Sequence, residues 1–118
     1  MTEPRGTRLF RLAFWAAALL AFVMAVLPQP QLPTAPSDKL LHVLAFATLS
    51  LLGCLAFPRV SLLKLAVALS AFGALIEVVQ AIPGLNRYSE AADWVADTAA
   101  IAVVLALVFL WRRYTKAS

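Results

Sequence analysis

Apolar residues run along the chain in four long stretches, and most polar and charged residues fall in the joints between them. The stretches cover residues 9–27, 40–57, 62–82 and 93–111. Each is close to the roughly 20 residues with which an α-helix crosses the hydrocarbon layer of a membrane. The pattern therefore predicts an all-α, polytopic membrane protein, in which residues 1–118 form a single domain built as a bundle of four transmembrane helices.

Composition points the same way and excludes several classes of protein. The chain is 63% hydrophobic and 14% charged, with a mean hydropathy of +0.87, whereas soluble domains are roughly half apolar. The single cysteine excludes a disulfide framework, and one histidine without a cysteine pair argues against a zinc centre. No glycine-rich phosphate loop or nucleophile elbow is present, so we expect no metal and no cofactor.

The cations separate by side along the chain. Eight of the ten lie before the first stretch or at its start, in or beside the joint between the second and third, or after the fourth. Because cytoplasmic joints carry an excess of lysine and arginine, this distribution predicts that both termini are cytoplasmic. We therefore attribute the net charge of +4 to orientation in a membrane, and we expect no binding to nucleic acid.

The first stretch follows a basic start, as a cleaved signal sequence does. Its length, and the four prolines between residues 28 and 36, favour a span that is retained. Three spans with an external start would satisfy the charge rule equally well, so charge alone leaves this alternative open.

Polar side chains inside the predicted helices gather near one end of them. The set comprises Asp38, Lys39 and His42 in the second helix, Glu77 and Gln80 in the third, Arg87 in the next joint, and Asp93 and Asp97 in the fourth. Within each helix a spacing of three or four positions puts these residues on one face. Because an ionisable group inside a span costs roughly 2.5–3.5 kcal/mol on insertion scales, it normally faces the protein interior or water. We therefore predict a polar pocket that opens to the external side.

The same residues resemble the VanZ-like family of small bacterial membrane proteins. The resemblance rests on Asp38-Lys39-x-x-His42, on Glu77-x-x-Gln80, and on Arg87 followed six residues later by Asp93, within residues 38–100. Where the family usually has Asn-Thr-x-Gly, this chain has Asp97-Thr98-Ala99-Ala100. The resemblance implies a multi-pass protein of the bacterial cytoplasmic membrane with a role at the cell envelope. In some members that role is resistance to lipid-bearing glycopeptide antibiotics such as teicoplanin.

Three functional hypotheses follow, beside the interpretation that the polar residues are a structural clasp between helices. The favoured one is a non-catalytic protein whose pocket binds a membrane lipid, a lipid-linked wall precursor or a lipoglycopeptide. The second is a membrane enzyme that uses His42, Glu77 or Asp93 as acid and base on a lipid head group. The third is a small proton-coupled transporter assembled as a homo-oligomer. The absence of a proline or glycine pair that would break a predicted helix argues against this hypothesis.

Overall fold

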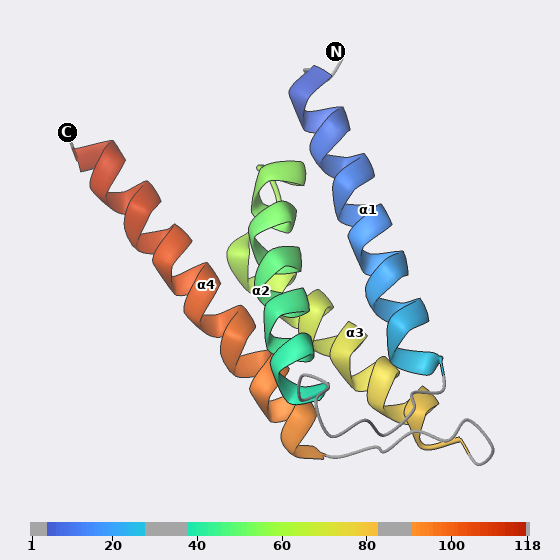
Figure 1. Ribbon diagram of the computed structural model, residues 1–118. Coiled ribbons are helices and arrows are strands. Elements are labelled where there is room, and N and C mark those ends of the chain that lie inside the picture. The colour runs from blue at the N-terminus through green and yellow to red at the C-terminus, as the bar shows by residue number, and fades with distance from the viewer. Residues whose placement is uncertain (1–4, 28–37, 83–90, 118) are drawn as a thin grey trace.

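The computed structural model describes residues 5–27, 38–82 and 91–117, which form four α-helices with short turns. The helices are α1 (Arg5–Val26), α2 (Asp38–Ala56), α3 (Leu62–Gln80) and α4 (Ala91–Ala117) (Figure 1). The all-α prediction is confirmed for this part of the chain. Helices α1, α3 and α4 are long and apolar enough to cross a membrane, and α2 contributes the shorter apolar run Leu40–Ala56.

The helix bounds follow the four apolar stretches closely, with the largest difference at the end of the chain. There α4 continues to Ala117, six residues beyond the predicted end at residue 111. The added turns carry Arg112, Arg113 and Lys116, which are good helix formers and interact favourably with the negative end of the helix dipole. Hydropathy marks where a helix can lie in lipid, and helix propensity extends it past that limit.

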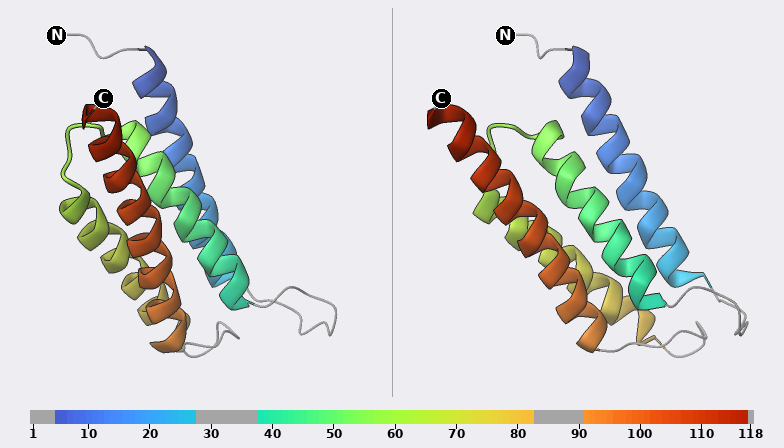
Figure 2. Two further views of the ribbon diagram at one scale, coloured as in Figure 1. Left: turned by 90° about the vertical axis from the view of Figure 1, so that its left-hand side faces the viewer. Right: turned by 60° about the vertical axis from the view of Figure 1, so that its left-hand side comes forward.

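Each helix runs opposite to the one before it, so the start of α1 and the end of α4 lie at the same end of the molecule (Figure 2). We name this the basic end, because it carries the cations at both extremities of the described chain and those around the α2–α3 turn. We name the opposite end, where α2 and α4 begin, the polar end. Helix α2 packs against α1, α3 and α4, and Figure 1 shows it between α1 and α4.

The core lies where α2, α3 and α4 meet. Phe46 and Leu49 of α2, Ile76 of α3 and Ile101 of α4 are almost fully buried there. Large apolar side chains also cover the outside of every helix, among them Leu63, which is 75% exposed. A soluble protein would expose few such patches, so this surface is the one expected of helices that face lipid.

Side chains also satisfy backbone carbonyls at two helix ends, where the last turn lacks intrahelical partners. At the basic end Arg11 of α1 donates from Nε to the carbonyl of Ala56, the last residue of α2, at 2.9 Å. At the polar end Gln80 of α3 donates from Nε2 to the carbonyl of Ala25 in the last turn of α1, also at 2.9 Å. These two bonds tie α1 to its neighbours at both of its ends.

Candidate functional site

Five of the eight predicted pocket residues are buried in the structure at the polar end. They are His42 of α2, Glu77 and Gln80 of α3, and Asp93 and Asp97 of α4. Asp38 and Lys39 belong to the first turn of α2, but their side chains lie outside the described part of the structure, and Arg87 lies wholly outside it. The structure therefore places buried polar side chains from three helices, these five residues, at one end of the molecule.

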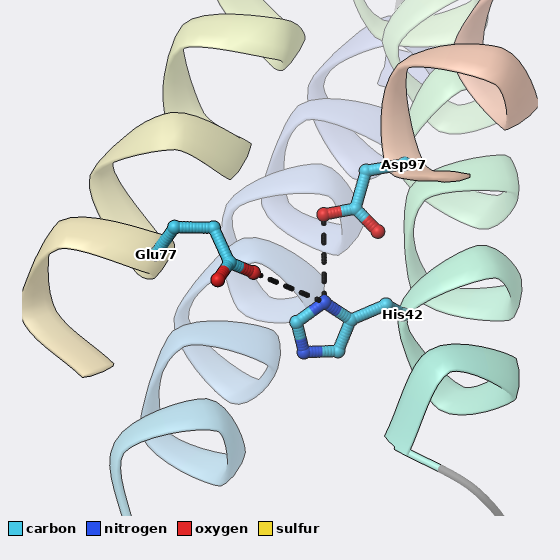
Figure 3. A group of neighbouring side chains, drawn as sticks. All are labelled: His42, Glu77 and Asp97. Atoms are coloured by element: carbon cyan, nitrogen blue, oxygen red, sulfur yellow. Dashed lines mark ion pairs between the residues drawn. The ribbon is translucent and has the colours of Figure 1, made fainter. Parts of the chain in front are cut away.

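Three of the five form a close cluster, with one residue from each of three helices. His42, Glu77 and Asp97 each offer a donor atom, and these atoms lie within 4.8 Å of one another. His42 Nδ1 is 3.4 Å from Asp97 Oδ2 and 4.0 Å from Glu77 Oε1, and both carboxylates point toward the imidazole (Figure 3). We call these residues the His42 cluster.

Asp97 is the most enclosed member of the cluster. Its side chain is 0% exposed, and within the described structure neither carboxylate oxygen has a hydrogen-bond partner. Burying a polar group without a hydrogen bond is costly, and burying a charge without compensation costs more. The position is therefore one that a structural role alone explains poorly.

Gln80 and Asp93 do not belong to the cluster. Gln80 is 1% exposed, and its amide serves the end of α1 through the bond to Ala25. Asp93 is buried one turn before Asp97 on α4 but contributes no donor atom to the group. Glu77 and Gln80 are three positions apart on α3, but they have different partners. Glu77 belongs to the His42 cluster, whereas Gln80 joins α3 to α1.

The close approach of α4 to α3 depends on Gly73, which the sequence analysis did not single out. A Cβ added there would lie 3.3 Å from Asp97 Oδ2, tighter than most such contacts. One turn away, Trp94 donates from Nε1 to the carbonyl of Ser70 at 3.0 Å, and the hydroxyls of Ser70 and Thr98 lie 3.0 Å apart. A glycine within an apolar helix is the sequence signal for such a contact, because it lets helix backbones come close.

An apolar groove between α1 and α2 adjoins the cluster. It has a volume of about 340 Å³, and its lining includes Ala21 and Met24 of α1 and Leu41 and Ala45 of α2. His42 also lines the groove, so the groove and the cluster share one residue. The small side chains of α1 leave the space, and their four-residue spacing, with alanine at 17, 21 and 25, was visible in the sequence.

The arrangement offers two kinds of chemistry. The imidazole and two carboxylates can exchange protons, donate and accept hydrogen bonds, or coordinate a cation. The groove beside them accepts an apolar chain. Together they form an amphipathic site, with its polar part enclosed by three helices and its apolar part open between α1 and α2.

Comparison with protein-family models, with curated proteins and with solved structures found no match to this chain. The resemblance to the VanZ-like family therefore stays a prediction from the residues that carry it.

Proposed function

We propose that this protein is a four-span protein of the bacterial cytoplasmic membrane that binds an amphipathic, lipid-linked ligand at its polar end. The apolar chain of the ligand lies in the groove between α1 and α2, and its polar head group meets the His42 cluster. The observation that carries the proposal is that His42, buried between two carboxylates, also lines an apolar groove of about 340 Å³.

The groove and the cluster contribute differently to binding in a membrane. Lipid tails are as apolar as leucine, so moving a tail from lipid into the groove gains little from the hydrophobic effect. The groove therefore selects by shape, and polar contacts with the head group must provide most of the affinity. Such contacts are favourable because the donors of the cluster are held by three different helices and need little rearrangement.

The charge distribution supports an orientation for the proposed protein. Eight of the described cations lie toward the basic end, on the first turns of α1, beside the α2–α3 turn and on the last turns of α4, whereas Lys39 lies in the first turn of α2 at the polar end. By the positive-inside tendency the basic end, with both termini, is cytoplasmic, and the polar end faces the exterior. A ligand with its head group at the outer surface of the membrane reaches the cluster from that side.

The resemblance to the VanZ-like family narrows the ligand class within this proposal. A lipoglycopeptide of the teicoplanin type and a lipid-linked wall precursor both join an apolar chain to a polar head. Both meet the outer leaflet where the polar end is proposed to lie. Binding of either one would connect the site to antibiotic tolerance at the cell envelope.

Filling the groove tests the proposal. Ala21→Phe places a ring in the groove, whereas Ala16→Phe adds the same ring at an exposed position on another face of α1. We expect native mass spectrometry of the detergent-solubilised protein to show teicoplanin retained by wild type and Ala16→Phe and lost from Ala21→Phe. Equal retention by both variants would contradict a groove-bound ligand.

A cellular experiment then separates a binding site from a structural clasp. We expect expression of the wild type to raise the teicoplanin concentration that cells tolerate. His42→Ala should lose this effect while its level in the membrane stays normal. A fall in the protein level that parallels the loss of tolerance would instead favour the clasp.

A membrane enzyme is the second candidate, because of the contact between His42 and Asp97. A carboxylate beside one imidazole nitrogen orients the ring and stabilises its protonated form, as a histidine general base requires. A new lipid product in extracts of cells with the wild-type protein, absent with His42→Ala, would favour the enzyme over the binding protein.

A further inference from the structure

The His42 cluster brings together the side chains that metals use most, although the sequence analysis expected no metal site. The small number of histidines and cysteines predicted no metal site, but one histidine with two carboxylates is also a set of metal ligands. The three residues are far apart in the sequence, on α2, α3 and α4, yet each offers a ligand atom within 4.8 Å of the others. Figure 3 shows both carboxylates directed at the imidazole.

The spacing of these atoms suits a shared ion. An N–H···O hydrogen bond has a donor–acceptor distance of about 2.7–3.2 Å, whereas His42 Nδ1 lies 3.4 Å from Asp97 Oδ2 and 4.0 Å from Glu77 Oε1. Tetrahedral zinc with nitrogen and oxygen ligands at about 2.0–2.2 Å sets its ligand atoms about 3.3–3.6 Å apart. One distance already has this length, and a small rotation of the Glu77 side chain would provide the other.

Charge provides a second, independent reason. Asp97 is fully buried, and both of its oxygens are without a hydrogen-bond partner in the described structure. Two ionised carboxylates enclosed among apolar helices would repel each other in a medium of low dielectric constant. A divalent cation between them cancels both charges and occupies the direction in which Asp97 points.

The donor set selects among metals. Magnesium and calcium prefer sites made of oxygen atoms, and copper(I) prefers sulfur ligands, so one nitrogen with two oxygens suits neither group. Imidazole and carboxylate together suit zinc, which commonly takes three protein ligands and leaves a fourth position for water or another oxygen. We propose that His42, Glu77 and Asp97 form a binding site for one Zn²⁺ ion. The site does not depend on the lipid-linked ligand proposed above.

Zinc binding is tested on the full chain, purified in detergent without a polyhistidine tag, since such a tag would itself bind zinc. The protein is stripped with EDTA, dialysed against a known concentration of ZnCl₂ and analysed for metal by mass spectrometry. We expect one zinc ion per chain, and no comparable retention of Mg²⁺. Asp97→Asn should weaken binding by about 100-fold or more, because loss of even an outer partner of a metal ligand costs roughly 10–100-fold.

Asp93→Asn is the matched control, because Asp93 is a buried carboxylate one turn away on the same helix that contributes no atom to the cluster. We expect it to retain zinc with nearly the affinity of the wild type. Cys54→Ser should also retain zinc, since Cys54 is a buried residue of a metal-binding type in α2 that contributes no atom to the cluster. Equal loss in Asp97→Asn and Asp93→Asn would overturn the proposal.

A spectroscopic readout keeps the test decisive if a variant folds poorly. Co²⁺ substituted for Zn²⁺ in the wild type should give the visible absorption of a tetrahedral site with nitrogen and oxygen ligands. Absence of both this spectrum and stoichiometric zinc in folded wild-type protein would refute the site. Ala21→Phe should still bind zinc, so failure of the groove and failure of the metal site give different results.

Discussion

Gly73 offers the sharpest test of how closely α4 lies on α3. A Cβ at this position would lie 3.3 Å from Asp97 Oδ2, 3.4 Å from Phe46 Cζ and 3.5 Å from Trp94 Cδ1. The ring atoms of Phe46 and Trp94 belong to large side chains, and Trp94 is further held by its bond to α3. We therefore predict that Gly73→Ala displaces the Asp97 carboxylate and destabilises the protein.

The size of the effect follows from two opposing terms. Alanine is a better helix former than glycine by about 1 kcal/mol. Forcing an extra carbon into a packed interior costs about 1–3 kcal/mol. The expected net result for Gly73→Ala is a loss of about 1 kcal/mol in the free energy of unfolding. Gly73→Leu should lose more than about 3 kcal/mol, because the longer side chain meets the same three groups.

Gly6 provides the matched control. It lies in the first turns of α1, and a Cβ added there meets nothing within 4 Å. Gly6→Ala therefore gains the higher helix propensity of alanine without a steric cost, and it should be neutral or slightly stabilising. Reversible unfolding in mixed micelles, followed by circular dichroism, measures both variants. If Gly73→Ala were as stable as Gly6→Ala, the close packing of α4 on α3 would be wrong.

Two further variants test the bonds at the helix ends. Gln80→Leu removes the donor to the Ala25 carbonyl, and we expect it to lower the free energy of unfolding by about 1 kcal/mol, within the range of interhelical hydrogen bonds in membranes; unchanged stability would contradict the bond. Arg11→Met removes the donor to the Ala56 carbonyl and the guanidinium over the Phe57 ring, and should cost about 1–2 kcal/mol. Arg11→Lys should recover little of this loss in the same unfolding assay, because an ammonium lacks the planar geometry of the guanidinium.

Much of the fold could be predicted because lipid imposes a simple rule on sequence. A span must be apolar over roughly 20 residues and must satisfy its own backbone, so hydropathy alone marks each helix. The rule fails at the helix ends, where α4 continues through Arg112 and Arg113. Charged residues interrupt an apolar stretch, but they do not interrupt a helix.

The sequence indicated at which end of the helices the polar residues of the candidate site lie, but not which side chains contact one another. The i, i+3 and i, i+4 spacings place residues on a helix face, yet they do not say which neighbouring helix that face meets. Glu77 and Gln80 share such a spacing, but one faces His42 and the other bonds to α1. The rotation of each helix, set by packing at positions such as Gly73, decides these partners.

Asp97 distinguishes a functional cluster from a structural clasp through its effect on stability. Asp97→Asn keeps the size of the side chain and removes one of two buried carboxyl groups, while Glu77 remains near His42. A clasp predicts that the variant is destabilised, by about 3–5 kcal/mol if a buried pair is broken. A site retained for its ligand predicts the reverse, because a carboxylate without hydrogen-bond partners burdens the metal-free protein.

We therefore expect the free energy of unfolding of EDTA-treated Asp97→Asn to be at least as high as that of EDTA-treated wild type. Zinc should reverse this order. At a zinc concentration of about 100 times the dissociation constant, the wild type gains about 2.7 kcal/mol, whereas a variant that does not bind gains nothing. A variant less stable than the wild type without zinc, and unchanged by zinc, would show that Asp97 holds helices together instead of holding an ion.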